Sequence, residues 1–323
     1  MNIAHVQTKI KFFYYLKSYA RIFFPKLRTK AHFDALKSQL KPAELEKIQA
    51  RVAYYNKVVD AFSLPSAVTK VSDLLYPVTP KSYFFDTYEY AQFFDKQLPL
   101  AWVFGDVITV PAVPSIVKSR PISQGADNAN SVLMNLDKVR HFRFVTNDKP
   151  FLEKKDQLIG RAGVYQKHRI EFFEKYFNHP LCDLGQVNKA EGRPELWYKP
   201  KISVSEHLEF KFVLSLQGND VATNLKWIMS SNSIAVTPKP TYETWFMEGT
   251  LVGGKHYIEI KPDYSDLEAQ LTYYLAHPDE CMAIIQNAHE HCQQFFNPEV
   301  EDVCSMMVLE QYFACSKGSG KSI

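Results

Sequence analysis

The stretch that decides the fold is FVLSLQGNDVATNLKWIMSSNSIAV, residues 212–236. An apolar, strand-like run ends at Gly218, two polar residues follow, and a helix-like run begins near Val221 or Ala222. In a parallel sheet such a joint faces the crevice in which ligands bind, and the free N–H groups of the helix can receive phosphate oxygens. Taken alone, the joint favours a simpler interpretation, in which Gly218 makes a turn and Asp220 caps the helix.

The rest of the second half repeats this pattern of strand and helix. Strand-like runs begin at Leu158 (LIGRAGV), Leu181 (LCDLGQV) and Ser233 (SIAVT), with helix-like runs such as YQKHRIEFFEKYF between them. YETWFMEG, which begins at Tyr242, is interpreted as a further helix, and helices are expected from Ser265 to the end. This alternation predicts parallel strands joined by helical crossovers, which is a Rossmann-like α/β domain.

The first half has a different pattern. A proline start and helical spacing predict a helix over residues 42–62. Short aromatic or β-branched runs follow (SYFFD, AWVFGDVITV, SIVKS and HFRFVT), and these are interpreted as strands of one sheet. The polar stretch NDKPFLEKKDQ is the best linker candidate. The chain is therefore divided into domains of residues 1–150 and 151–323, and the last helix could return to the first domain.

Composition limits the classes of protein to which this chain can belong. With 46% hydrophobic residues and no run of about 18 uncharged apolar residues, the chain is expected to be globular, and soluble or peripheral to a membrane. A net charge of +3 is too small to argue for nucleic acid as a partner. Five cysteines without a CxxC pair and scattered histidines predict no metal site.

Positive charge is concentrated at the N-terminus. No acidic residue precedes Asp34, whereas basic residues alternate with aromatic ones. The basic residues are Lys9, Lys11, Lys17, Arg21, Lys26, Arg28 and Lys30. This mixture suits an anionic membrane surface and argues against a signal peptide. An amphipathic helix docked on its own domain would show the same apolar stripe, so both interpretations stay open.

A second joint in the later half has the same character as the first. LIGRAGVYQKHR places Gly160 and Gly163 around Arg161, and Arg169 follows at a helix start. Arginine beside glycine-rich backbone after a strand can hold a diphosphate bidentately. Glu243, at the start of the helix expected in KPTYETWF, could accept both hydroxyls of a ribose, or it could only cap a helix dipole.

Residues 158–296 resemble glycosyltransferase family 90, which includes Rumi-type protein O-glucosyltransferases, capsule-associated xylosyltransferases and bacterial lipopolysaccharide core glycosyltransferases. FKFVLSLQGNDVATNLKWIMSSNSIAVTPKPTYETWFMEGTLVGGKHYIEI carries most of the resemblance and is most similar to the lipopolysaccharide branch. The resemblance implies a GT-B architecture, with two Rossmann-like domains facing a cleft, and an inverting, metal-independent transfer from a UDP-sugar. The first domain, with its N-terminal helical extension, would then serve the acceptor, and the second would bind the nucleotide sugar.

The resemblance also implies a set of donor-binding residues in the second domain. These are Arg161, Gly163, Arg169, Gly218, Asn219, Asp220, Val221, Ala222, Asn224 and Glu243. The sequence departs from the pattern of the eukaryotic members where Ala162 follows Arg161 and where Asn224 replaces an arginine. The chain has no DxD spacing, so we expect arginines, with Lys226 as a further candidate, to meet the charge of the leaving UDP.

An inverting transfer needs a base to take the proton of the acceptor hydroxyl. Aligning SYFFDTYEY on the family's aspartate–tyrosine pair makes Glu89 the expected catalytic base, with Asp86 as the alternative. Lys118 and Arg120, in VKSRPI, are expected to hold an acceptor phosphate or carboxylate, or else to lie in a solvated loop.

Taken together, we expect a cytoplasmic hexosyltransferase that is peripheral on the inner face of the bacterial inner membrane. The donor is expected to be UDP-glucose or UDP-galactose, as a substrate and not a cofactor, and the acceptor an inner-core lipopolysaccharide sugar. No cofactor, metal or nucleic acid is expected. The alternatives are synthesis of a capsule or another surface glycan, and a non-catalytic nucleotide-sugar-binding protein. The sequence does not decide the hexose, the acceptor hydroxyl or the oligomeric state.

Overall fold

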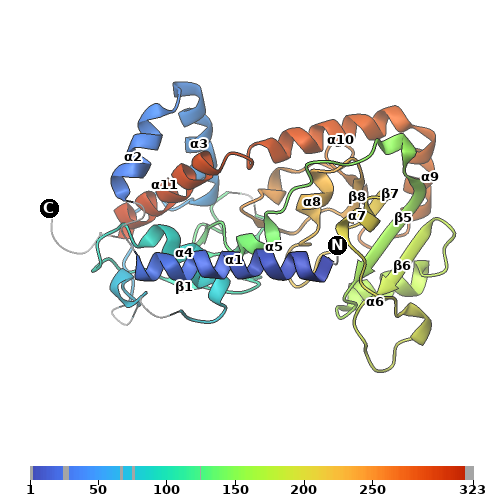
Figure 1. Ribbon diagram of the computed structural model, residues 1–323, viewed down its shortest axis with the longest axis horizontal. Helices are drawn as coiled ribbons and strands as arrows, with labels where there is room; N and C mark the ends of the chain where they lie inside the picture. Colours follow the sequence, from blue (N-terminus) through green and yellow to red (C-terminus); the bar gives the residue numbers. More distant parts are fainter. Residues whose placement is uncertain (1–2, 25–28, 66–67, 75–76, 124, 317–323) are drawn as a thin grey trace. The chain divides into compact units, whose positions relative to one another are not determined.

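The computed structural model describes residues 3–24, 29–65, 68–74, 77–123 and 125–316, with side chains from Lys11 onward. The chain forms two compact units, each described here by itself (Figure 1). Unit 1 comprises residues 1–140, 242–247 and 295–323, and unit 2 comprises residues 141–241 and 248–294. The chain thus enters unit 2 at His141, returns to unit 1 for six residues from Tyr242, and ends in unit 1.

Unit 2 is built on a five-stranded parallel sheet of order β10-β8-β7-β5-β6. Its strands are β5 (Lys155–Ala162), β6 (Cys182–Gln186), β7 (Phe210–Leu214), β8 (Ile234–Pro238) and β10 (Ile258–Ile260). Its helices are α6 (Lys167–Tyr176), α7 (Val204–His207), α8 (Leu225–Met229), α9 (Leu267–Ala276) and α10 (Pro278–Gln293), with the 3-10 turns η3 (Phe151–Glu153), η4 (Glu195–Trp197) and η5 (Glu248–Thr250). The predicted alternation of strand and helix is therefore confirmed in this unit.

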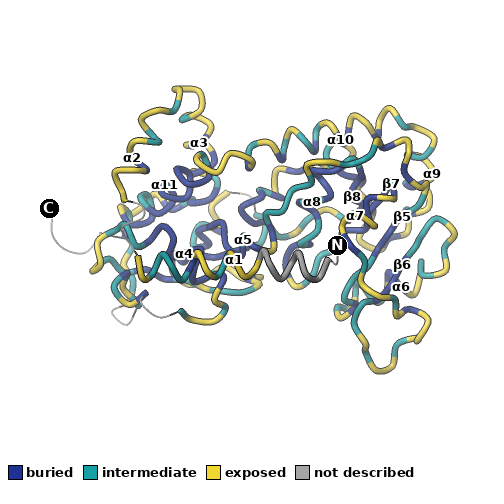
Figure 2. Tube along the Cα trace, in the orientation of Figure 1, coloured by how far each residue is buried: buried dark blue, intermediate teal, exposed yellow. Residues whose placement is uncertain are grey.

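The strands of unit 2 are buried because helices cover both faces of a parallel sheet. Leu158, Phe212, Val236 and Ile258 are fully buried in one apolar core, and Figure 2 draws much of these strands in the colour of buried residues. Such strands appear in a sequence as short continuous apolar runs, so they could be predicted from the hydrophobic pattern.

Unit 1 contains a small parallel sheet, an antiparallel strand pair and helices. The parallel strands, in the order β1-β2-β4, are β1 (Trp102–Val103), β2 (Ser115–Val117) and β4 (Ser131–Leu133). The antiparallel pair is β3 (Ser119–Pro121) with β9 (Tyr242–Thr244). The helices are α1 (Ile3–Phe23), α2 (Lys30–Gln39), α3 (Pro42–Tyr55), α4 (Lys81–Ala91), α5 (Lys138–His141, ending at the unit boundary) and α11 (Pro298–Ser316), with the 3-10 turn η2 (Val71–Asp73).

Several predictions of secondary structure were wrong, most of them in the first half. SYFFD lies in helix α4, HFRFVT contains no strand, and AWVFGDVITV contributes only the two residues of β1. The helix that begins at Pro42 ends at Tyr55 and not at Phe62. YETWFMEG begins with strand β9, so the helix expected there is absent from these described residues.

The separate segments of unit 1 are joined by buried aromatic and ionic contacts. The ring of Tyr55, from α3, stacks on Trp245 with centroids 3.8 Å apart. Glu301, from α11, accepts a hydrogen bond from the Trp245 indole at 2.6 Å and pairs with Arg51 at 2.6 Å. Each of the three segments therefore contributes side chains to one core, and helix α11 packs against α3.

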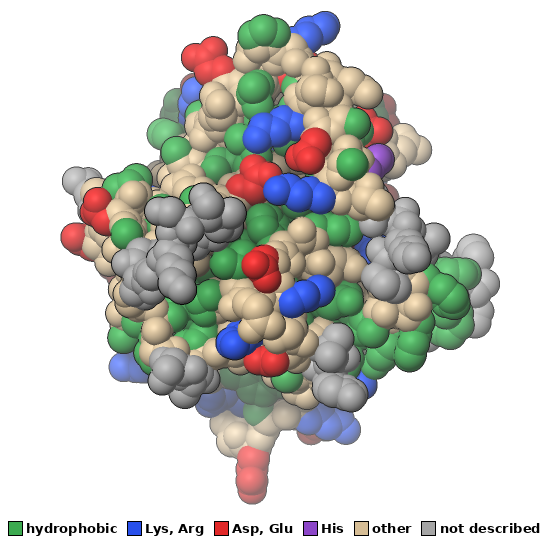
Figure 3. Space-filling view, turned by 90° about the vertical axis from the view of Figure 1, so that its left-hand side faces the viewer, with side chains coloured by type: hydrophobic (Ala, Val, Ile, Leu, Met, Phe, Trp, Pro, Cys, Tyr) green, Lys and Arg blue, Asp and Glu red, His purple; other side chains and the backbone are tan. Residues whose placement is uncertain are grey.

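Helix α1 packs on α4 within unit 1, where the Tyr14 hydroxyl donates to Asp86 at 2.8 Å. This contact shows that α1 docks on its own unit, and it does not test the membrane interpretation. Lys26 and Arg28 lie outside the described residues, and the side chain of Lys9 is not described. No helix among the described residues has the length and apolar character needed to cross a bilayer. On the face drawn in Figure 3, Lys and Arg side chains are interspersed with Asp and Glu.

Candidate active site

The strand order of unit 2 creates a switch point between β5 and β7. From β5 the chain moves outward to β6, then returns to the other side of β5 to form β7, and continues through β8 to β10. The loops after β5 and β7 therefore diverge at neighbouring carboxyl ends, and this is where open parallel α/β sheets bind ligands. Gly163 and Gly218 lie in these two loops, so the two joints that the sequence singled out flank one switch point.

Arg169, near the start of α6, connects the two loops. Its Nη1 donates to the carbonyl of Gly163 at 2.8 Å, its Nη2 to Leu216 at 2.7 Å, and its Nε to Gln217 at 2.8 Å. Burial lowers the pKa of the guanidinium, although an arginine stays charged. Among the described residues it has carbonyl partners and no carboxylate partner. Arg169 thus places a half-buried positive charge at the switch point without an ion pair to a described carboxylate, which favours an anionic ligand.

The other residues of the loop after β7 are held by local contacts. Asn219 accepts from Gln166 at 3.1 Å, and Asn224 donates to the Leu214 carbonyl at 2.9 Å, while Asp220, Val221 and Ala222 are buried. Helix α8 begins at Leu225 and has only five residues, so the helix start expected near Val221 or Ala222 was wrong. The loop is therefore shaped by Arg169 and Asn224 more than by a helix end.

Arg161 lies at the end of β5, but its charge is already paired. Its Nη2 donates to Asp183 at 2.9 Å, and Lys199 pairs with the same carboxylate at 2.8 Å. Its Nε is buried and has no hydrogen-bond partner, as is also true of the side-chain oxygen of Gln166 and the amide nitrogen of Asn188. Unpartnered polar atoms on the same side of the sheet are typical of a site that binds a polar ligand.

Glu243 and Arg120, predicted for two different ligands, pair with each other inside unit 1. Glu243 lies in β9 opposite Arg120 in β3, and neither is more than 2% exposed. The Arg120 Nε donates to one carboxylate oxygen at 2.7 Å, and the Tyr54 hydroxyl donates to the other. The helix start expected at Glu243 was therefore wrong, and the residue belongs to unit 1.

The two predicted base candidates form a buried ionic cluster on α4. Glu89 is 8% exposed and pairs with Arg21 of α1 and with Lys138 at 3.0 Å. Asp86 is 1% exposed and accepts from the Tyr14 hydroxyl and from the backbone N–H of Lys138 at 3.1 Å. Burial raises the pKa of Asp86 to about 7, whereas Lys138 and Arg21 outweigh burial and lower that of Glu89.

Sequence reasoning missed another carboxylate at the edge of the small sheet. Asp106 follows β1, just after Gly105, whose φ of +120° strongly favours glycine. Its side chain is 36% exposed and accepts at 2.6 Å from Lys118, which follows β2 and is almost completely buried. The expected acceptor ligand Lys118 therefore holds Asp106 in place. Asp106 was overlooked because AWVFGDVITV was interpreted as one uninterrupted strand.

Comparisons with known proteins identify the family. Residues 179–315 match the model of Glycosyl transferase family 90. Over 275 residues the chain is 42% identical to O-glucosyltransferase LpsA of Dichelobacter nodosus, an alignment that covers 84% of this chain and 85% of that protein. The chain belongs to glycosyl transferase family 90. It is therefore a glycosyltransferase, as the sequence resemblance implied.

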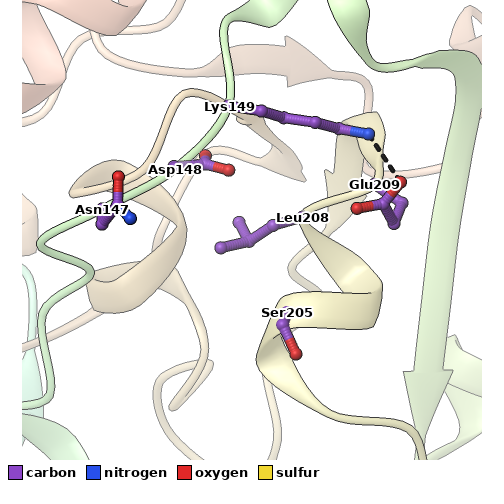
Figure 4. A pocket seen from close by; sticks show the side chains of 6 residues that line it. All are labelled: Asn147, Asp148, Lys149, Ser205, Leu208 and Glu209. Carbon is purple, nitrogen blue, oxygen red and sulfur yellow. Dashed lines mark hydrogen bonds and ion pairs between the residues drawn. The ribbon is translucent and has the colours of Figure 1, made fainter.

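A hollow elsewhere in this glycosyltransferase is a weaker candidate for the donor site. Its lining consists of Asn147, Asp148, Lys149, Ser205, Leu208 and Glu209 (Figure 4). These residues precede β5 and β7, so the hollow lies at the amino ends of the strands. Lys149 pairs with Glu209 across it, and Asp148 is held by Lys154 at 2.8 Å. Its charged side chains therefore all have partners of opposite charge, whereas Arg169 at the switch point has only carbonyl partners among the described residues.

Two further features of the glycosyltransferase concern the groups that could balance the charge of a diphosphate, which are a lysine and a metal ion. Lys226, a candidate to meet the charge of UDP, is fully buried and pairs with Glu248 at 2.8 Å, so its charge is already balanced by a carboxylate. In the part of the chain that the structure describes, no three His, Cys, Asp or Glu side chains gather as they would around a metal ion.

Proposed function

We propose that this glycosyltransferase moves a hexose from a UDP-sugar to an inner-core lipopolysaccharide sugar at the inner face of the bacterial inner membrane. The observation that carries the proposal is the 42% identity to a protein named O-glucosyltransferase, over most of both chains. That name favours glucose over galactose as the hexose. The likeness of residues 212–260 to the lipopolysaccharide branch of the family supports the acceptor.

The donor diphosphate is assigned to the switch point of unit 2. Arg169 supplies a positive charge between the loops after β5 and β7, and the unpartnered Nε of Arg161 lies at the end of β5. In this proposal these groups balance the charge that develops on the departing UDP, so that no metal ion is required. The GT-B architecture implied by the sequence resemblance is part of the same proposal.

The general base is assigned to Asp106, ahead of Glu89 and Asp86. Asp106 is the most exposed of the three, and Lys118 orients it without covering it. In the proposed step the acceptor oxygen bonds to the anomeric carbon, and its proton passes to the Asp106 carboxylate. The bond from the anomeric carbon to UDP breaks at the same time, and its electron pair leaves with the phosphate. A direct displacement of this kind inverts the anomeric centre.

The purified protein should release UDP only when both UDP-glucose and a lipid A–core acceptor are present. A donor panel with UDP-galactose tests the hexose, NMR of the product tests inversion, and EDTA with and without added Mn²⁺ tests metal independence. Asp106→Asn should lower kcat by at least about a hundredfold, which is the usual contribution of a general base. The same assay of Glu89→Gln and Asp86→Asn provides the matched comparison, because these variants remove the other two candidate bases. UDP binding without turnover on any acceptor would support the non-catalytic alternative instead.

A further inference from the structure

Helix α1 packs one face on α4 and exposes an apolar face on its opposite side. The face that packs on α4 carries the Tyr14 hydroxyl, bonded to Asp86, and Arg21, paired with Glu89. The opposite face carries Phe12, Leu16 and Phe23, which are 62%, 55% and 73% exposed. These three residues fall within about 40° of one another at 100° per residue, so they form a single stripe.

The packed face also holds Tyr15 and Tyr19, whose rings lie 6.0 and 4.8 Å from that of Phe85 in α4. Helix α1 therefore exposes a second apolar face, whereas an ordinary surface helix exposes a polar one. The stripe is extended by Phe13 and by Phe24, just past the helix end, which are 63% and 65% exposed. Scattered exposed apolar residues are normal on any protein, but several large ones on a single helix face indicate an interaction surface. We call Phe12, Phe13, Leu16, Phe23 and Phe24 the outer stripe of α1.

We propose that the outer stripe of α1 binds the surface of an anionic lipid bilayer. The occupant is argued from charge, because the first 33 residues contain seven Lys or Arg and no Asp or Glu. Aromatic rings that enter the headgroup boundary, accompanied by cations that meet anionic headgroups, are the features of helices that lie in a membrane interface. Arg21 and Tyr14 meanwhile anchor the opposite face to α4, so the helix binds lipid without leaving its own unit.

The inference deepens the proposed location at a membrane and is independent of sugar transfer. Its test therefore uses the full chain without donor or acceptor, so failure of lipid binding is distinguishable from failure of catalysis. The probe is flotation with vesicles of phosphatidylethanolamine and phosphatidylglycerol, compared with neutral vesicles of phosphatidylcholine. The wild type should float with the anionic vesicles, and this binding should weaken in high salt because ionic attraction is screened.

The decisive variant is the triple substitution Phe12→Ser, Leu16→Ser and Phe23→Ser. A matched control replaces three equally exposed apolar residues outside α1, with Val59→Ser, Leu152→Ser and Leu196→Ser, which are 79%, 60% and 69% exposed in the wild type. The α1 triple variant should lose at least about tenfold in vesicle affinity, because each apolar side chain that enters the interface contributes to binding. The control should bind as the wild type does. Circular dichroism and thermal unfolding verify that both variants are folded.

Three outcomes would overturn the proposal. The first is a wild type that does not bind anionic vesicles, and the second is an α1 triple variant that binds as well as the control. The third is a wild-type dimer in sedimentation equilibrium that the α1 triple substitution converts to a monomer, since the outer stripe would then be covered by a second copy of the chain.

Discussion

At the scale of single residues, we expect the buried pair of Arg120 and Glu243 to stabilise unit 1. Both carboxylate oxygens are occupied, one by Arg120 and one by the Tyr54 hydroxyl. Removing one member of a buried pair leaves an uncompensated charge, so we expect Glu243→Gln to lower the free energy of unfolding by about 3 kcal/mol. Urea unfolding without any nucleotide measures this loss.

The double variant Arg120→Met, Glu243→Gln is the control for that prediction. Because it removes the remaining charge as well, it should lose less stability than the sum of the two single variants. A Glu243→Gln protein as stable as the wild type, but impaired in UDP binding, would restore the ribose role expected from the sequence.

Asp86 gives a pH dependence with a defined sign. Burial raises its pKa from 3.8 in the unfolded chain to about 7 in the folded one. Between these values the folded state binds the extra proton, so this group stabilises the fold at low pH and loses that contribution as the pH rises through 7. Relative to Asp86→Asn, the wild type should therefore become progressively less stable between pH 4 and pH 8.

Urea unfolding of the two proteins at matched pH measures that difference, and the neighbouring Glu89 and Lys138 are retained in both. A difference that stays constant over this range, or that grows in favour of the wild type, would contradict a protonated Asp86 in the fold.

At the scale of elements, the pairing of β5 with β6 depends on Gly185. This residue lies opposite Arg161, and a Cβ added there would lie 2.7 Å from the Lys199 Cβ and 2.8 Å from the Arg161 Cδ. Overpacking of this kind typically costs 1–3 kcal/mol, so we expect Gly185→Ala to lose about 2 kcal/mol of stability. Chemical unfolding of the variant measures the loss.

Gly218→Ala is the matched control, because its nearest neighbour would be the Arg169 Nη2 at 3.6 Å, an ordinary contact. It should change stability by less than about 0.5 kcal/mol. Equal losses in the two variants would mean that Gly218 is needed for the fold itself, which the sequence interpretation of that joint as a turn would favour.

The elements of unit 2 could be predicted from the sequence, and those of unit 1 largely could not. Parallel strands between helices appear as short apolar runs bounded by turn residues, and β5 to β8 were found in this way. Helix α4 is buried on all sides from Ser82 to Ala91, so no polar stripe reveals its helical period, and its aromatic residues favour a strand. The hydrophobic pattern of a sequence therefore does not identify a helix that is buried on every side.

At the scale of the whole molecule, the candidate site was only partly predictable because unit 1 is discontinuous in sequence. The two joints of unit 2 were each predicted to follow a strand, and the structure adds that the two strands, β5 and β7, are neighbours in the sheet, which the sequence alone did not show. The helix predicted around Glu243 was wrong because β9 pairs with β3, a long-range contact that local reasoning cannot show. Asp106 was missed because β1 is only two residues long.

The division into units also predicts which segments are protected from amide hydrogen exchange when UDP binds. Because Arg169 joins the loop after β5 to the loop after β7, UDP bound at the switch point should slow amide hydrogen exchange in both loops together, and not in α4. Arg169→Met removes the charge and the three carbonyl contacts, so it should weaken UDP binding by at least tenfold, since a charged hydrogen bond contributes about 1.5–3 kcal/mol. Exchange followed by mass spectrometry, with UDP and with adenosine diphosphate as the comparison, measures both effects. Protection confined to α4 and the residues around Asp106 would assign the nucleotide to unit 1 and reverse the roles proposed for the two units.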